Sequence, residues 1–295
     1  MNTIRVGALS VACVEESVAP GFDVFQIFEE CTPDELERHR PWLAPDYLDA
    51  GSNKLMISMH SWLVRTERHT ILVDACGGDH KNRPAMPRFH QKETGYLNRL
   101  NAAGVVPEQI DYVMCTHLHV DHVGWNTQLR DGRWVPTFPN ARYLMSRKEH
   151  AHWEARSKDP DRGGINAGVY EDSVLPVIEA GQATFADEVF EIESGLVMEP
   201  APGHTPGHSI LQAESAGEHA VFCGDMVHSP LQVHNPAWNS RFCELPEAAR
   251  TTRQGILAHC CEHRGRLFPA HFGGSHFGSV EDAAGGFRFI PGKVE

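Results

Sequence analysis

The chain has 295 residues, 41% of them hydrophobic, and carries 26 Lys and Arg against 39 Asp and Glu, a formal net charge of −13. This acidic balance argues against nucleic acid and anionic membrane surfaces as partners, because both attract basic surfaces. The hydrophobic content excludes a disordered protein and is enough for one large folded domain.

No stretch of the sequence has the run of about 18 apolar residues that a membrane span needs, so no membrane segment is expected. An apolar run near the N-terminus is followed directly by Glu15 and Glu16 and lacks a small-residue cleavage site, which favours a β-strand over a secretory signal. The eight cysteines are scattered and include no CxxC pair. We therefore expect free thiols and a cytoplasmic protein.

The first part of the chain reads mainly as strands. Apolar runs predict β-strands at residues 4–14, 55–66, 70–74 and 111–115. A helix is expected to begin after Thr32, because Thr is a good N-cap, Pro33 suits the first helical position and Glu35 reaches back to the cap. A second helix is expected over residues 88–103, ending at Gly104.

The rest of the chain alternates helices and strands. Helices are expected at residues 146–156, capped by Ser146, and at 170–180 and 246–263. Strands are expected at residues 141–145, 189–192, 197–201, 209–213, 219–223 and 267–270. Strands interleaved with helices, with no Pro/Gly-rich linker, predict one α/β domain over residues 1–295.

A dense histidine motif follows the strand at residues 111–115. Three histidines and one aspartate stand within six residues: His117, His119, Asp121 and His122. Neutral imidazoles and carboxylates are the usual ligands of zinc and related divalent ions. Four ligands this close serve one ion only with strain, so the motif favours two ions. A solvated histidine-rich loop would not explain why the cluster directly follows an apolar strand.

Three later motifs have the same character. His204 stands on a turn made rigid by Pro and Gly, and Asp225 and His271 each follow an apolar strand directly. One histidine after a strand is more often structural than functional. Taken together, and following the dense histidine motif in this order along the chain, the three motifs indicate a metal centre.

With these motifs the chain resembles the metallo-β-lactamase superfamily over about residues 55–278. The resemblance implies an αββα sandwich, in which two mixed β-sheets lie face to face with helices outside, and two Zn²⁺ ions at one edge. It implies that Asp74, at the end of an early strand, supports the ligands without binding a metal itself. It also implies a ligand set: His117, His119 and His204 for the first ion, Asp121, His122 and His271 for the second, and Asp225 bridging both.

Two metal ions of this kind share a hydroxide that attacks a carbon or phosphorus centre. We expect Asp121 to orient this nucleophile, and Asp74 and His208 to fix ligand imidazoles through hydrogen bonds. The acyl-homoserine lactonase branch has a tyrosine three residues after the bridging aspartate. This chain has His228 there, which resembles the methyl parathion hydrolase branch and suits a proton donor.

The expected substrate is a small, apolar or aromatic lactone, ester or phosphotriester. Aromatic and apolar residues near the motifs are expected to wall its pocket: Trp125, Trp153, Met226, Trp238 and Phe272. Residues 1–53 are expected to form an N-terminal extension that packs on the domain. In the branches named above such segments contribute to dimer contacts and substrate walls, so a homodimer is left open.

Three alternatives remain beside the dinuclear hydrolase. One is a mononuclear iron redox enzyme of the sulfur dioxygenase type, which leaves the second metal position unfilled. Another is a hydrolytic dehalogenase of an activated aromatic ring. The third is a binding protein that has lost its metals. The complete second ligand set favours two metals over the first and third alternatives.

Overall fold

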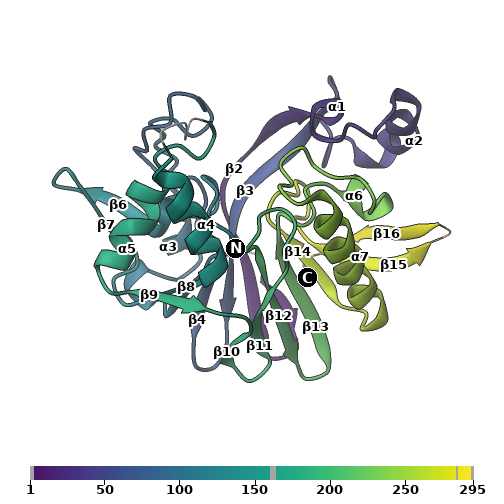
Figure 1. The fold of residues 1–295 in the computed structure, drawn as a ribbon. Coiled ribbons are helices and arrows are strands. Elements are labelled where there is room, and N and C mark those ends of the chain that lie inside the picture. Colours follow the sequence, from purple (N-terminus) through teal and green to yellow (C-terminus); the bar gives the residue numbers. More distant parts are fainter. Residues whose placement is uncertain (1–2, 160–163, 284, 294–295) are drawn as a thin grey trace.

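The computed structural model describes residues 3–159, 164–283 and 285–293, and within them the chain forms two β-sheets that face each other (Figure 1). The first sheet has the order β1 (Ile4–Val6), β2 (Leu9–Asp23), β3 (Lys54–Arg65), β4 (Thr70–Val73), β5 (Tyr112–Met114), β8 (Arg142–Ser146) and β9 (Ala183–Ala186). The second has the order β10 (Phe190–Glu193), β11 (Leu196–Pro200), β12 (Ser209–Ser215), β13 (Glu218–Gly224), β14 (Arg266–Pro269), β15 (Gly278–Ala283) and β16 (Gly286–Pro291). Both sheets are mixed, because β4, β5, β8 and β9 run parallel in the first and β13 runs parallel to β14 in the second.

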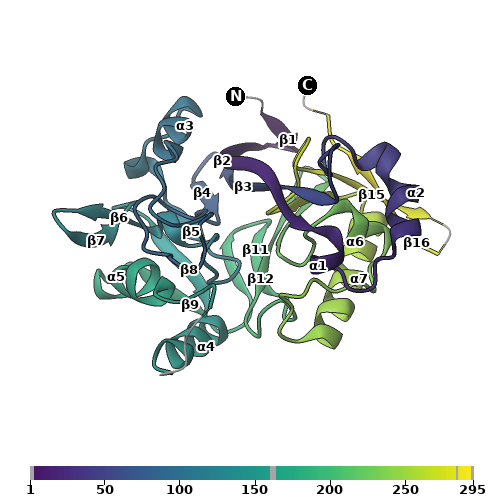
Figure 2. The same cartoon turned by 90° about the horizontal axis from the view of Figure 1, so that it is seen from above.

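Helices flank the two sheets on their outer sides (Figure 2). The helices are α1 (Val24–Ile27), α2 (Pro33–Leu43), α3 (Tyr96–Ala102), α4 (Arg147–Ser157), α5 (Leu175–Glu179), α6 (Pro230–His234) and α7 (Pro246–Glu262). Helices α3, α4 and α5 lie on the side of the first sheet, and α6 and α7 on that of the second (Figure 1). This arrangement is the expected αββα sandwich, which the structure confirms.

A hydrophobic core fills the space between the sheets. Trp62 of β3 packs against Phe268 of β14 with ring centroids 4.9 Å apart, and Phe268 stacks on Phe222 of β13 at 4.7 Å. Burying a large apolar side chain contributes about 1.5–3 kcal/mol, so these aromatic contacts hold the sheets together. The sheets in turn fix where their strands end, and the loops at those ends carry the polar residues described below.

The N-terminal segment is partly built into the first sheet. The strand expected at residues 4–14 is divided by a turn at Gly7, whose φ of +56° is left-handed, so that β1 and β2 form a hairpin. The long strand β2 pairs with β3 and leads into α1 and α2, and Trp42 of α2 packs on His234 of α6 at 4.7 Å. The division into a domain and an extension at residues 1–53 stays a prediction.

Most of the other expected elements are present. Thr32 caps α2 in a capping box with Glu35, and Ser146 caps α4, as the sequence predicts. The expectation of a helix from residue 88 is wrong, because Gly95 is left-handed, with φ +70°, and α3 begins only after it. The β6–β7 hairpin (Thr127–Arg130 and Arg133–Pro136) and strands β9, β15 and β16 were not expected.

In the described ranges we find no helix with the length and apolar character needed to cross a bilayer. The eight cysteines are all free thiols, as expected.

Lys81 has a fully buried side chain beside the β6–β7 hairpin. Its Nζ donates hydrogen bonds to Thr127 Oγ1 at 2.7 Å and to the Asp172 carbonyl at 3.1 Å, and lies 3.6 Å from the centre of the Trp134 ring. Arg83 donates two more hydrogen bonds, of 2.7 and 2.6 Å, to the Asp172 carboxylate. Burial lowers the pKa of Lys81 to about 7, although Asp172 favours the charged form.

This lysine should make the stability of the fold depend on pH. Below about pH 7 it is charged in both the folded and the unfolded protein, and its burial destabilises the fold. Between pH 7 and 10.5 only the unfolded protein keeps the proton, so the free energy of unfolding should rise with pH by about 1.4 kcal/mol per unit. Lys81→Met should remove this slope in denaturant titrations, and Lys148→Met, at an exposed position, should keep it. Equal slopes in the wild type and Lys81→Met would contradict the assignment.

Candidate metal centre

Seven polar side chains gather beyond the ends of strands β5, β13 and β14. They come from the loop after β5, the loop between β11 and β12, and the positions that directly follow β13 and β14. They form two groups, each with its ligand atoms within 4.8 Å of one another: His117, His119, His204 and Asp225, and separately Asp121, His122 and His271. The structure thus brings together every residue that the sequence predicts as a metal ligand.

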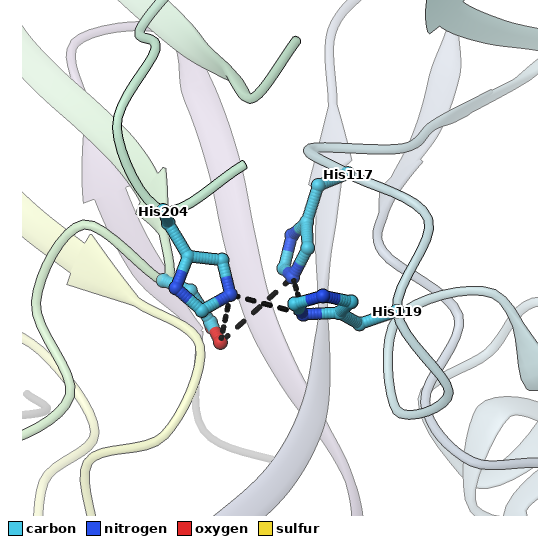
Figure 3. A group of neighbouring side chains, drawn as sticks. His117, His119 and His204 are labelled. Atoms are coloured by element: carbon cyan, nitrogen blue, oxygen red, sulfur yellow. Dashed lines mark hydrogen bonds and ion pairs between the residues drawn. The ribbon is translucent and has the colours of Figure 1, made fainter. Parts of the chain in front are cut away.

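In the first group three imidazole nitrogens point at one another (Figure 3). His119 Nδ1 lies 2.9 Å from His117 Nε2 and 3.0 Å from His204 Nε2. Asp225 Oδ2 lies 3.3 Å from His204 Nε2 and 3.8 Å from His117 Nε2. Several nitrogens and one carboxylate oxygen directed at one point are the donor set that zinc and related divalent ions take.

The second group faces the other oxygen of the same carboxylate. Asp225 Oδ1 lies 2.9 Å from His271 Nε2 and 3.2 Å from His122 Nε2. The two oxygens of Asp121 lie 3.8 Å from these ring nitrogens. His122 Nε2 is buried and has no hydrogen-bond partner within the part of the chain that is described. An unpaired buried donor or acceptor is costly, so this atom fits a ligand position for a metal ion.

The electrostatics of the two groups differ. Burial lowers the pKa of His119 to about 4, and burial with the adjacent imidazoles lowers the pKa of His117 and His204 well below the usual value. A lowered pKa favours the neutral imidazole, which is the form that binds a metal ion. Burial also acts to lower the pKa of His122 and His271, but Asp225 and the other nearby carboxylates outweigh it and raise both pKa values.

Asp74, at the end of β4, orients two of the ligand rings. Its Oδ2 accepts hydrogen bonds from His122 Nδ1 and from Thr116 Oγ1, both at 2.8 Å, and Thr116 Oγ1 lies 3.0 Å from His117 Nδ1. The Nδ1 atoms of both rings are therefore occupied, which leaves their Nε2 atoms to face the centre. Carboxylates commonly hold metal-binding histidines in this way.

His208 has a different contact from the one expected. Its Nε2 accepts a hydrogen bond of 3.2 Å from the backbone N–H of Asp225, and not from a ligand imidazole. The cause is Gly224, whose φ of +50° is left-handed and where a Cβ would lie only 2.7 Å from His208 Nε2. His208 therefore packs under the turn that presents Asp225.

Glu149, which sequence analysis missed, connects the loops that carry the first group. Its Oε1 accepts hydrogen bonds from the Leu118 backbone N–H at 3.1 Å and from Trp153 Nε1 at 2.7 Å. Its Oε2 accepts from Thr205 Oγ1 at 2.7 Å and from the Gly207 backbone N–H at 3.0 Å. The carboxylate is fully buried, so these four donors are what compensates its charge.

A cavity opens onto both groups, and His228 lines it. Both ring nitrogens of His228 are buried and lack hydrogen-bond partners among the residues the structure describes, although Nε2 lies 3.2 Å from Asp225 Oδ2. The rest of the polar lining is formed by His119, Asp121, His204, Asp225 and His271. The apolar lining is formed by Phe22, Ile27, Ile57, Met59, Phe89, Ile165 and Phe242.

The residues expected to wall the pocket lie elsewhere, which corrects the expectation. Four of them are buried in the core and are not among the described residues that line the cavity: Trp125, Met226, Trp238 and Phe272. Trp125, for example, stacks on Tyr96 with centroids 5.5 Å apart and donates to Glu16 at 2.8 Å. Trp153 packs against His119 at 5.2 Å without lining the cavity. The chain turns back into the core after each ligand, so neighbours in sequence are not neighbours in the pocket.

Comparison with known proteins agrees with this geometry. The family model of the metallo-beta-lactamase superfamily matches residues 59–283, more than half of the chain. The chain belongs to this superfamily. The expectation drawn from the motifs is thereby confirmed.

Curated relatives in the superfamily include N-acyl homoserine lactonases. The N-acyl homoserine lactonase AttM of Azorhizobium caulinodans is 27% identical over 129 residues, which cover 40% of this chain and 41% of that protein. The chain spans about half the length of the curated relatives it matches.

Two solved structures share the fold over nearly the whole chain. The hydrolase AbOPH, of the beta lactamase superfamily, is 22% identical with a TM-score of 0.81, covering 100% of this chain and 98% of that one. AidC, a dizinc quorum-quenching lactonase in complex with a product, is 21% identical with a TM-score of 0.75, covering 99% of this chain and 97% of that one. At these identities the likeness establishes the fold alone.

The four hydrogen bonds of Glu149 lead to a prediction. Glu149→Gln replaces one carboxylate oxygen, which accepts two hydrogen bonds, by an amide NH₂ group, which cannot accept them. The loop after β5 and the loop between β11 and β12 should then lose the side chain that connects them. We expect a loss of about 1–3 kcal/mol in stability and a 10–100-fold weaker metal affinity, measured by thermal unfolding and by competition with a chelator. Glu154→Gln, at a partly exposed position on the same helix where the carboxylate pairs with Lys158, is the matched control. Unchanged metal affinity in Glu149→Gln would show that Glu149 does not position the ligands.

Proposed function

We propose that the protein is a metal-dependent hydrolase with a dinuclear zinc centre. Asp225 supports this most directly, because its two oxygens face different histidine groups: Oδ2 lies 3.3 Å from His204 Nε2, and Oδ1 lies 2.9 Å from His271 Nε2. One carboxylate between two ligand sets is the arrangement of a bridging ligand. The first ion would be held by His117, His119 and His204, and the second by Asp121, His122 and His271.

When bound, two such ions supply a hydroxide nucleophile at neutral pH and polarise the oxygen of the bond to be broken. The side chains of this protein have separate tasks around them. The carboxylate of Asp121 borders the cavity beside the second ligand set, where it can accept a hydrogen bond from the nucleophile and aim it. His228 borders the same cavity, and its ring nitrogens have no hydrogen-bond partner among the described residues, so it can donate a proton to the leaving group.

The shape and chemistry of the cavity favour a small neutral substrate with an apolar or aromatic part. Aromatic and aliphatic side chains from the N-terminal segment, such as Phe22 and Ile27, face the polar floor across the cavity. A lactone, an ester or a phosphotriester would place its polar centre on the floor and its apolar part against this wall. The lactonases among the curated relatives agree with the first of these classes.

Metal analysis tests the centre. After mild chelation the wild type should hold about two divalent ions or more per chain. Asp225→Asn should hold at least one ion fewer under the same conditions. The substitution keeps the size of the side chain but removes the charge that faces both histidine groups. Asp131→Asn, on an exposed turn, is the control and should keep the wild-type content. A single iron per chain would contradict the proposal and favour the mononuclear redox alternative.

A substrate panel tests the reaction and the role of His228. We would compare the wild type with His228→Ala on lactones, aryl esters, phosphotriesters and an activated aryl halide. His219→Ala, at the start of β13 and so at the opposite end of the strand from Asp225, is the control. We expect kcat to fall roughly 10²–10⁴-fold for substrates with poor leaving groups and much less for those with good ones, with metal content unchanged. An equal loss for both kinds of leaving group would refute the proton-donor role, and turnover of the halide alone would favour a dehalogenase.

A further inference from the structure

A second group of metal-ligating side chains lies outside the centre described above. Cys13, His60 and His276 each offer one ligand atom, and these three atoms lie within 4.8 Å of one another. Cys13 comes from β2, His60 from β3 and His276 from the loop that follows β14. Nothing in the proposed hydrolysis uses them.

The backbone fixes two of these residues on one face of the first sheet. In the antiparallel pairing of β2 with β3, Cys13 stands opposite Trp62 and Glu15 stands opposite His60. Residues two apart on a strand point to the same side, so these four side chains share a face. His276 approaches that face from the other sheet, with its ring centroid 4.9 Å from that of His60 and its Nε2 3.4 Å from Glu15 Oε2.

The hydrogen bonds around His276 are those of a metal ligand. Its Nδ1 lies 2.6 Å from the carbonyl oxygen of Phe272, which can only accept, so Nδ1 carries a proton and donates it. The other nitrogen, Nε2, lies 3.4 Å from Glu15 Oε2, so it can pair with that carboxylate in the metal-free protein and present its lone pair to a cation once it has given up its proton. A ring that donates one N–H to a backbone carbonyl and directs its other nitrogen inward is the common form of a zinc-binding histidine.

His60 can adopt the same form at little cost. Its Nε2 lies 3.1 Å from the carbonyl oxygen of Pro269, and its Nδ1 lies 2.8 Å from Ser58 Oγ. With its proton on Nε2, His60 donates to the Pro269 oxygen, which also accepts a hydrogen bond of 3.0 Å from Trp62 Nε1. Its Nδ1 then becomes free to bind a cation once the Ser58 hydroxyl turns away from it.

We propose that Cys13, His60 and His276 form a structural site for zinc or a similar borderline-soft divalent ion, with Glu15 as the fourth donor. One thiolate, two imidazoles and one carboxylate are a normal tetrahedral zinc set. In such a set the ligand atoms are roughly 3.5 Å apart, so the atoms of Cys13, His60 and His276 must close by up to about 1.3 Å, and the Glu15 carboxylate, which lies outside this group, must turn towards them. The thiol proton leaves for solvent when the sulfur binds.

This ion would connect the N-terminal strand β2 to the segment that carries His271. Ser58 already ties the neighbouring strand β3 to that segment, since its backbone oxygen accepts a hydrogen bond of 3.0 Å from His271 Nδ1 while its side chain contacts His60, also of β3. His276 lies five residues beyond His271 in the same loop. The ion would therefore hold this loop against both strands of the first sheet without touching substrate.

Cobalt distinguishes this site from the hydrolytic centre, because the ligand set of that centre contains no cysteine. Protein loaded with Co²⁺ should show a thiolate-to-cobalt charge-transfer band in the near ultraviolet. Cys13→Ser should lose the band and about one equivalent of metal. Cys31→Ser, at a buried cysteine between α1 and α2, should keep both.

The result that overturns the proposal is the absence of the band from the wild type, or its persistence at full intensity in Cys13→Ser. Either would mean that the residues form only a hydrogen-bonded cluster with a Glu15–His276 ion pair. If Cys13→Ser does not fold, His276→Gln provides the second test. It keeps the thiol but removes one nitrogen ligand, so the band should shift or weaken, and an unchanged band would also overturn the proposal.

Discussion

The buried carboxylate of Asp225 is the group on which the arrangement of the centre depends. It follows a strand of the second sheet, yet histidines from the loops of both sheets face it: His117 and His122 from the first, His204 and His271 from the second. A buried charge must be compensated, and here the compensation comes from both halves of the sandwich. The packed aromatic core sets how far apart the sheets stand, and so sets whether these side chains meet.

Other buried carboxylates support this arrangement from outside. Asp74 fixes His122 directly and His117 through Thr116, whereas Glu149 holds the loops on which His117, His119 and His204 stand. These groups have no chemical part in the reaction we propose. They convert flexible loops into rigid ones, because each accepts several hydrogen bonds that are strong in a buried environment. Buried hydrogen bonds therefore hold the loops that carry the centre, and the aromatic core holds the sheets from which these loops emerge.

The sequence predicts the ligands well because metal chemistry restricts which residues can serve and because each one follows a strand. It predicts the sandwich through the same motifs and not through periodicity. It does not predict Glu149, because a Glu three residues after Ser146 has the pattern of a capping box and gives no sign that its carboxylate reaches two distant loops. It also misplaces the pocket wall. An apolar residue such as Phe22 or Trp238 suits a core and a cavity equally, and only the path of the chain decides between them.

The cavity combines two parts of the chain with different constraints. Its floor comes from strand ends whose positions the two sheets fix, while part of its wall, including Phe22 and Ile27, comes from the end of β2 and from α1, which precede the region matched by the family model. Substitutions in this part of the wall leave the positions of the polar residues on the cavity floor unchanged. A protein built in this way can acquire a new choice of substrate through substitutions in a peripheral segment, while its catalytic apparatus is inherited intact.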